Sequence, residues 1–169
     1  MNENYKNIFS LENKLAFVVG GDGLIGKEIV KACLENEAEV VTLDYKKKIS
    51  TNNPRFHYEV FDCADLNNIE SNLQKYVNKY GSPDILINCS YPRTINWSKS
   101  SFESVNLNTL RKNVDIHMNS FSWIAKIICD EMVKSNTRGS VIQFGSIYGI
   151  LGQDLSVYEG TKMKENMIY

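Results

Sequence analysis

Three glycines near the N-terminus have the spacing of a phosphate-binding turn. Gly20, Gly23 and Gly26 form a G-x-x-G-x-x-G pattern between an apolar run at 15–19 and a helical pattern that begins at Leu24. Glycine permits a tight turn, close approach of the backbone to a pyrophosphate and close packing of the helix on the strand. The start of that helix offers unpaired N–H groups to the phosphates. The pattern therefore predicts a dinucleotide site, and a glycine turn without a ligand is the alternative.

A carboxylate stands where the adenosine ribose of such a ligand would bind. Asp44 ends the next apolar run, at 40–43. In this position a carboxylate accepts hydrogen bonds from the ribose hydroxyls and repels the additional phosphate of NADP. We therefore expect NAD in preference to NADP. Three lysines at 46–48, which otherwise form a solvated turn, weaken that preference.

The same glycines also fit part of a second phosphate-binding motif. Residues 21–27 read G-x-x-x-x-G-K, which is a P-loop up to its last position. That position should be a serine or threonine that holds magnesium, but it is Glu28, which would repel the β- and γ-phosphates. We therefore reject a nucleoside triphosphatase.

Apolar runs and helical patterns alternate along the chain and predict the elements that position these residues. The expected strands are 15–19, 40–43, 57–61, 85–87 and 141–144, and the expected helices are 24–36, 67–80 and 103–134. This alternation is typical of a parallel α/β sheet with helices on both faces. Tyr169 falls inside a further helical pattern, so we expect one domain over 1–169 that is incomplete at its C-terminus, with its fifth strand as an exposed edge.

Composition and charge exclude several classes of protein. The 169 residues carry 19 basic and 20 acidic side chains, so no basic surface predicts a nucleic-acid or membrane partner. No apolar run reaches membrane-spanning length and no signal peptide is present, which predicts a cytoplasmic protein. Four widely spaced cysteines are expected to be small buried apolar residues, and two histidines are too few to predict a metal centre.

Several segments together resemble the short-chain dehydrogenase/reductase family. They are VGGDGLIG at 19–26, FDCADL at 61–66, Asn88-Cys89-Ser90 after the fourth strand and Gly145-Ser146 after the fifth. Within the family, the stretches INCSYPR and SIYGILGQDLSVYEGTKM are similar to the flagellin-modification oxidoreductases. The resemblance implies a Rossmann-like doubly wound parallel sheet of strand order 3-2-1-4-5 with the last strands missing.

The resemblance also implies which residues hold the cofactor. The side chain of Asp62 would bind the adenine amino group, and the glycine turn would hold the pyrophosphate. The full expected set is Gly20, Asp22, Gly23, Leu24, Ile25, Gly26, Asp44, Asp62, Cys63, Asn88 and Ser90.

The catalytic groups implied by the family are a serine, a tyrosine and a lysine. Ser146 would orient the substrate oxygen, and a tyrosine hydroxyl would exchange a proton with it while the lysine lowers the tyrosine pKa. Tyr158 and Lys162 satisfy the Y-x-x-x-K pattern. The flagellin-modification pattern instead favours Tyr169, with its lysine beyond this chain, and leaves Tyr158 in a loop or the substrate pocket.

Two further residues have alternative interpretations. The family has an asparagine, which holds a water in a proton relay, at the position of His117. His117 therefore either takes that role or is an ordinary helix residue near the site. Arg93 follows the fourth strand and either binds a phosphate or carboxylate of the substrate or is solvated.

These observations predict an NAD-dependent oxidoreductase that acts on a secondary alcohol or ketone. The resemblance to the flagellin-modification group suggests a sugar or sugar nucleotide as the small-molecule substrate, and the family implies a homo-oligomer, a dimer here. The alternative is a catalytically incomplete module that only binds a nucleotide or a partner.

Overall fold

The computed structural model describes residues 8–46 and 49–161, and it contains the five predicted strands. The strands are β1 (Leu15–Val19), β2 (Glu39–Asp44), β3 (Phe56–Val60), β4 (Ile85–Asn88) and β5 (Ser140–Gln143). The helices are α1 (Gly26–Glu35), α2 (Ile69–Tyr80), α3 (Leu107–Val114) and α4 (Ser120–Lys134). Each observed strand lies within one residue of its predicted bounds.

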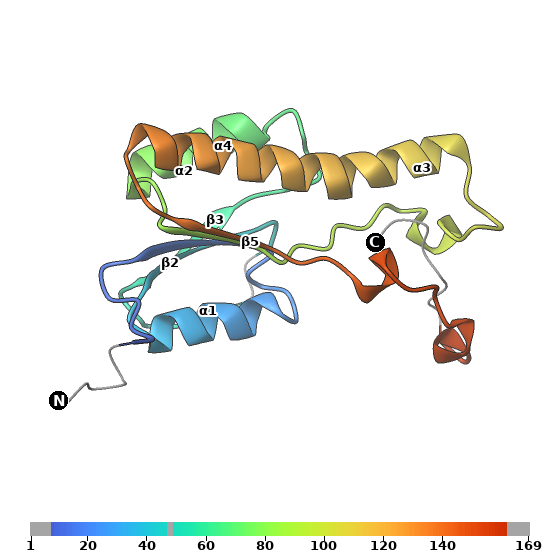
Figure 1. The fold of residues 1–169 in the computed structure, drawn as a ribbon, viewed down its shortest axis with the longest axis horizontal. Coiled ribbons are helices and arrows are strands. Elements are labelled where there is room, and N and C mark those ends of the chain that lie inside the picture. Colours follow the sequence, from blue (N-terminus) through green and yellow to red (C-terminus); the bar gives the residue numbers. More distant parts are fainter. Residues whose placement is uncertain (1–7, 47–48, 162–169) are drawn as a thin grey trace.

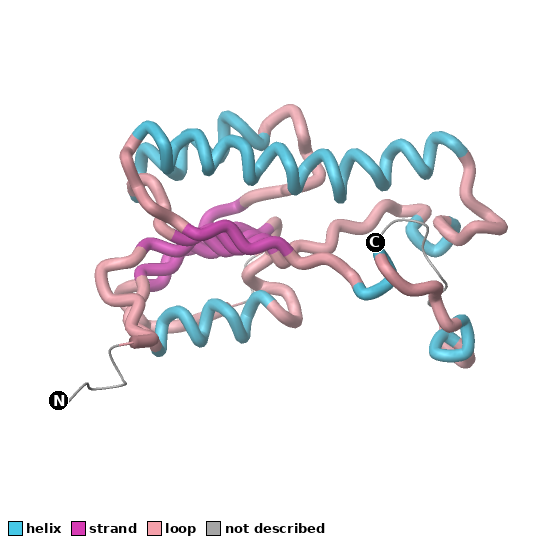
Figure 2. Tube along the Cα trace, in the orientation of Figure 1, coloured by secondary structure: helices cyan, strands magenta, loops and turns pink. Residues whose placement is uncertain are grey.

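The strands form one parallel sheet in the order β3-β2-β1-β4-β5, as predicted. Its centre is β1, where Phe17 is level with Val41 of β2 on one side and Leu86 of β4 on the other. Helix α1 covers one face, and α2, α3 and α4 lie on the other (Figures 1 and 2). Since both faces are covered, the central strands are mainly apolar on both faces rather than alternating, with Thr42 as a buried polar exception in β2.

Alternate side chains of β1 enter two separate cores. Ala16 and Val18 pack toward α1 with Val30 and Val40, whereas Phe17 and Val19 pack toward α2 and α4. The second core also contains Leu43, Leu73, Leu86, Ile124 and Ile128, all fully buried. Burying each such side chain contributes about 1.5–3 kcal/mol, so the two cores hold the carboxyl ends of β1, β2 and β4 in fixed positions.

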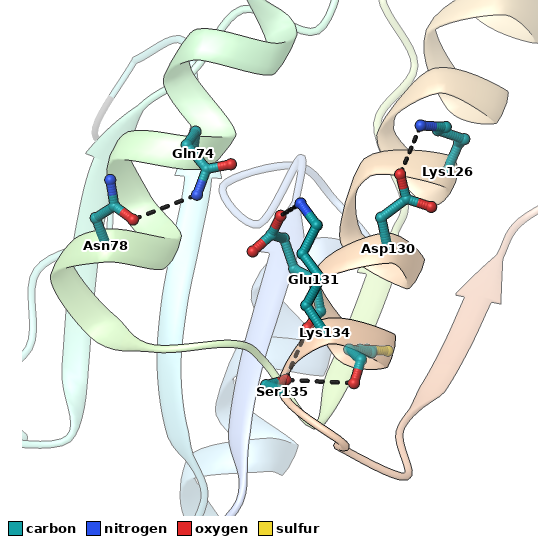
Figure 3. A network of polar contacts seen from close by, with 8 residues as sticks. Gln74, Asn78, Lys126, Asp130, Glu131, Lys134 and Ser135 are labelled. Atoms are coloured by element: carbon teal, nitrogen blue, oxygen red, sulfur yellow. Dashed lines mark hydrogen bonds and ion pairs between the residues drawn. The ribbon is translucent and has the colours of Figure 1, made fainter.

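The outer surfaces of α2 and α4 carry exposed polar contacts. Gln74 donates to Asn78 on α2, and Lys126 pairs with Asp130 on α4 (Figure 3). Each contact joins residues i and i+4 of its own helix and is exposed, so each contributes a few tenths of a kcal/mol.

The predicted helix at 103–134 is divided in the structure. Helix α3 starts at Leu107 because the Asn106 side chain accepts a hydrogen bond from the Thr109 amide at 3.0 Å, an N-cap. A π-helical turn, Asp115–Asn119, then separates α3 from α4. Such turns occur frequently at functional sites because they redirect side chains on one helix face.

Two expectations about exposure have different outcomes. All of β5 is exposed at the edge of the sheet, as predicted.

The prediction that the four cysteines are buried is wrong for Cys129, which is exposed on α4. Cys33 and Cys63 are buried, and Cys89 is half-buried. Within 8–46 and 49–161, no helix is long and apolar enough to cross a bilayer.

Candidate cofactor and substrate site

The glycine turn between β1 and α1 requires glycine for steric reasons. Gly20 has a φ of +74°, and a Cβ there would lie 2.6 Å from the Cα of Ser90. A Cβ on Gly26 would lie 2.1 Å from the carbonyl oxygen of Gly20, and one on Gly23 would lie 3.0 Å from the same oxygen. The glycine turn therefore packs closely against both the start of α1 and the loop after β4. Because its glycines have no side chains, its backbone is bare at these three positions.

The start of α1 is open to a ligand. No side-chain oxygen caps the helix at Ile25, so side chains do not occupy its first amide groups. The Leu24 and Ile25 side chains are exposed, at 83% and 51%. The arrangement therefore offers backbone donors and the positive end of the helix dipole to an anion, beside an apolar surface.

Asp44 and Asp22 lie together, buried, at the end of β2. The Asp44 carboxylate accepts hydrogen bonds from the amides of Tyr45 at 2.8 Å and Asp22 at 3.0 Å, one to each oxygen. The Asp22 carboxylate in turn accepts one from the Ile49 amide at 3.1 Å. A carboxylate has about four acceptor positions, so Asp44 is held in place and still has positions for ribose hydroxyls.

The two carboxylates make this corner strongly negative. Tyr58 donates its hydroxyl to the Asp44 carbonyl oxygen at 2.7 Å. Burial, together with the negative charges of Asp44 and Asp22, raises the pKa of Tyr58 to about 12. The charged form of the phenol is thus disfavoured here, first by burial and then by the two carboxylates.

The expected adenine-binding residues follow β3. Asp62 is exposed, and its carboxylate accepts a hydrogen bond from the Ala64 amide at 2.9 Å. Cys63 is buried next to Ser90, and burial raises the pKa of its thiol to about 11. This thiol therefore stays protonated near neutral pH and acts as a small apolar wall.

Asn88 and Ser90 complete the group at the end of β4. The Asn88 side-chain oxygen accepts hydrogen bonds from the Ser90 hydroxyl at 2.7 Å and the Ser90 amide at 3.2 Å. The Asn88 Nδ2 atom is buried without a partner. The structure thus brings the expected cofactor residues to the carboxyl ends of β1, β2, β3 and β4, where ligands bind in open α/β sheets.

The expected catalytic residues are only partly within the described chain. Ser146 follows β5, and its hydroxyl accepts a hydrogen bond from the Tyr148 amide at 3.2 Å. The side chain of Tyr148 is hydrogen-bonded to Tyr158, and this bond is the main cause that raises the pKa of Tyr148. Ser146 and Tyr158 are therefore linked through Tyr148. Lys162 and Tyr169 lie outside the described residues.

His117 lies in the π-helical turn and is 9% exposed. Its ring is 5.0 Å from the Tyr91 ring, and its Nε2 atom is buried without a partner. Burial lowers the pKa of His117, although a hydrogen bond to the Pro92 carbonyl partly offsets this. The ring is accordingly neutral near pH 7.

Asn113, one helical turn before His117, was not among the expected site residues. Asn113 is buried, donates to the Ser100 hydroxyl at 2.8 Å and has an Oδ1 atom without a partner. Its four-residue spacing from His117 was the available signal, since residues at i and i+4 share a helix face. Sequence reasoning could not place Ser100, because it comes from a separate loop.

The chain is similar in sequence to known proteins over nearly its whole length. The sequence model of the family described as short chain dehydrogenase matches residues 14–168. The post-translational flagellin modification protein A of Campylobacter coli is 25% identical over 169 residues, covering 94% of this chain and 65% of that protein. L-fucose dehydrogenase of Bos taurus is 24% identical over 155 residues, covering 88% of this chain and 55% of that protein.

A solved structure extends the similarity to three dimensions. The crystal structure of a short chain dehydrogenase from Leptospira borgpetersenii with bound NAD+ matches with a TM-score of 0.80 at 25% identity. The match covers 94% of this chain and 60% of that one, so the chain spans less than two thirds of the length of these relatives. Because the family model covers nearly every residue and the strand order agrees, the chain belongs to the short chain dehydrogenase family.

Proposed function

We propose that the protein is an NAD-dependent oxidoreductase that interconverts a secondary alcohol and a ketone. The observation that carries the proposal is the glycine turn, pressed against Ser90, with the Asp44 carboxylate held at the same edge of the sheet. A Cβ at Gly20 would collide with the backbone of Ser90, so the close approach of the turn to the loop after β4 requires glycine here. The bound NAD+ in the Leptospira protein, with its similar fold, supports this assignment.

The preference for NAD over NADP rests on charge. Asp44 offers its remaining acceptor positions to the two ribose hydroxyls of NAD. The additional phosphate of NADP would replace a hydroxyl donor with a negative group beside two buried carboxylates, Asp44 and Asp22. That replacement both removes a hydrogen bond and adds repulsion.

The reacting groups lie after β5 in this proposal. A bound nicotinamide would supply or accept the hydride. Ser146 would orient the substrate oxygen, and a tyrosine hydroxyl, of Tyr158 or Tyr169, would exchange the proton with it. Lys162 follows Tyr158 in the Y-x-x-x-K pattern, and its positive charge would favour the phenolate. The chain directly after Tyr158 is not helical as the pattern predicts, because the 3-10 turn ends at Tyr158 and Gly160 has a φ of +72°.

The substrate we propose is a sugar or a sugar derivative. One relative, L-fucose dehydrogenase of Bos taurus, is named for a sugar and supports this class. A sugar has the secondary hydroxyl groups that the proposed chemistry requires. The whole chain would act as a single nucleotide-binding domain in a homo-oligomer.

The test is a titration of the protein with NADH and NADPH, followed by energy transfer from tryptophan to the nicotinamide. We expect saturable NADH binding that is at least about tenfold tighter than NADPH binding. Asp44→Asn should weaken NADH binding by about ten- to a hundredfold, because a hydrogen bond to a charged group contributes about 1.5–3 kcal/mol. Asp44→Asn should also reduce the difference between the affinities for NADH and NADPH.

Glu35→Gln is the matched control, since it removes an exposed carboxylate at the far end of α1. This variant should bind NADH as the unaltered protein does. If neither cofactor binds to a protein that unfolds cooperatively, the proposed function is wrong. If NADH binds and no alcohol or ketone is turned over, the protein is the nucleotide-binding module instead.

A further inference from the structure

A row of side chains continues from the loop after β4 toward the π-helical turn. The Arg93 guanidinium lies 5.3 Å from the centre of the Trp97 ring. Trp97 donates its indole N–H to the Tyr91 hydroxyl at 3.3 Å, and the two rings meet edge to face at 6.4 Å. Tyr91 then contacts His117. We call Tyr91, Arg93, Trp97 and His117 the aromatic row.

The inner end of the aromatic row presents a hydrogen-bond acceptor. The ring of His117 is bonded to the Pro92 carbonyl, and Nε2 has no partner, so Nδ1–H makes that bond. A neutral imidazole that is protonated on Nδ1 carries a bare lone pair on Nε2. A buried acceptor of this kind is unfavourable unless a donor, such as a ligand hydroxyl, meets it.

The outer end of the aromatic row carries an uncompensated positive charge. Among residues 8–46 and 49–161, the guanidinium of Arg93 contacts the Trp97 ring and pairs with no carboxylate. Stacking on an indole restricts the orientation of the guanidinium, so less entropy is lost when it forms a bidentate bond. This geometry favours recognition of a carboxylate or phosphate oxygen pair.

The aromatic row lies at the edge of the sheet where the substrate would bind. Strands β4 and β5 are paired in parallel, with Asn88 level with Gln143. The loop that begins at Cys89 and the segment that contains Ser146 therefore leave the sheet side by side (Figure 1). Tyr91 is 43% exposed, so part of its ring is available to a ligand.

We propose that the aromatic row is the substrate subsite and that it takes a sugar bearing an anionic group, either a carboxylate or a phosphate. This inference rests on the proposed function and adds the charge of the substrate. Arg93 binds the anionic group, the rings of Tyr91 and Trp97 contact the apolar face of the sugar, and Nε2 of His117 accepts a sugar hydroxyl. A neutral sugar would leave Arg93 unpaired.

The test uses Trp97 as its own reporter. The chain has two tryptophans, so Trp123→Phe leaves only Trp97 to emit. Quenching is measured with glucuronate, glucose 1-phosphate, glucose and inorganic phosphate. We expect the two charged sugars to bind at least about tenfold more tightly than glucose or phosphate, because one charge-assisted hydrogen bond is worth at least that factor.

Three variants in the Trp123→Phe background assign the roles. Arg93→Gln should lower the affinity for the charged sugars to that for glucose. If a carboxylate and a phosphate bind to Arg93 alike, the affinities for glucuronate and glucose 1-phosphate should both fall. His117→Phe keeps a ring but removes Nε2, so it should weaken the binding of glucose and of the charged sugars by the same factor. Lys99→Gln is the matched control, since it removes an exposed charge from the same loop and should change nothing.

The outcomes separate this inference from the proposed function. Equal affinity for glucose and glucuronate, no effect of Arg93→Gln, or no quenching by any sugar would overturn the inference. Phosphate that binds as tightly as glucose 1-phosphate would overturn the sugar part of it. NADH binding is measured on the same variants: if it is intact, the proposed function stands whatever the sugars do, and if it is absent the proposed function fails on its own.

Discussion

The two edges of the sheet differ in the side chains that they expose. At the β3 edge, Glu59 accepts hydrogen bonds from Lys79 at 2.6 Å and Tyr80 at 2.8 Å, and His57 packs on the Tyr80 ring. At the β5 edge, Val141, Ile142 and Phe144 are between 37% and 46% exposed. Charged side chains on an edge strand discourage pairing with other chains, whereas exposed apolar residues favour association.

The β3 side of the sheet is more strongly stabilised by side-chain contacts than the β5 side. The central strands β1, β2 and β4 are largely buried and most of β3 is half-buried, and the expected cofactor residues lie at the carboxyl ends of these strands. Ser146 and the proposed reaction centre follow β5, yet the side chains of this strand are all exposed and gain little from burial. In the proposed function, the cofactor would bind at the well-packed side of the sheet and the substrate would react at the exposed side.

The largest expected effect contrasts a central strand with the β5 edge. Leu86→Ala empties a fully buried position in β4 and should lower the free energy of unfolding by about 2–5 kcal/mol. Ile142→Ala, in the strand paired next to it, should lower it by less than about 1 kcal/mol because Ile142 is 46% exposed. Urea unfolding measures both. Equal losses would mean that the β5 edge is covered in solution.

A smaller effect is expected from the ionic cluster at the β3 edge. Burial raises the pKa of Glu59, but hydrogen bonds from Lys79 and Tyr80 outweigh burial and leave the pKa lowered. A carboxyl with a lowered folded pKa stabilises the protein above its unfolded value, about 4.3, and loses that contribution as the pH falls through the folded pKa.

Glu59→Gln should therefore lower the free energy of unfolding at pH 7 by up to about 1 kcal/mol. The variant and the unaltered protein should converge once the pH falls below the lowered pKa of Glu59 in the folded protein. Urea unfolding across pH 3–7 measures this, with Glu70→Gln, an exposed glutamate on α2, as the control. A loss that does not change with pH would contradict the role given to the Glu59 charge.

The smallest effect is expected for the contact between His57 and Glu39, also at the β3 edge. His57 Nε2 lies 2.9 Å from Glu39, whose side chain is 51% exposed. His57→Asn should lower the free energy of unfolding by no more than about 0.5 kcal/mol, since solvent screens exposed pairs. Thermal unfolding at low and high salt measures the change. A loss as large as that of Glu59→Gln would show that the ring contact with Tyr80 matters more than charge.

Much of the fold was predictable because parallel strands that are buried on both faces are apolar at every position. That pattern placed β1, β2 and β4 within a residue of their bounds, and the order followed from the family resemblance. The cofactor residues were predictable for a related reason. Glycine spacing and a carboxylate at a strand end are local features, and the sheet brings them to one edge in any chain of this topology.

Other features depended on contacts between distant segments. No periodicity distinguishes exposed Cys129 from buried Cys33, because exposure depends on which helix face meets the sheet. The division of the long helix follows from a π-helical turn that the apolar pattern does not signal. The contact between Tyr91 and His117 joins residues 26 positions apart.

The sequence by itself determined the parallel α/β architecture, the glycine turn and the carboxylate at Asp44, because each depends on residue type and short-range spacing. The tertiary structure decided that Asp22 joins Asp44 in one negative corner and that Arg93 remains without a carboxylate partner among the described residues. It also decided that His117 is buried with Nε2 unpaired. Electrostatics and burial depend on distances through space, and only the packed chain sets those distances.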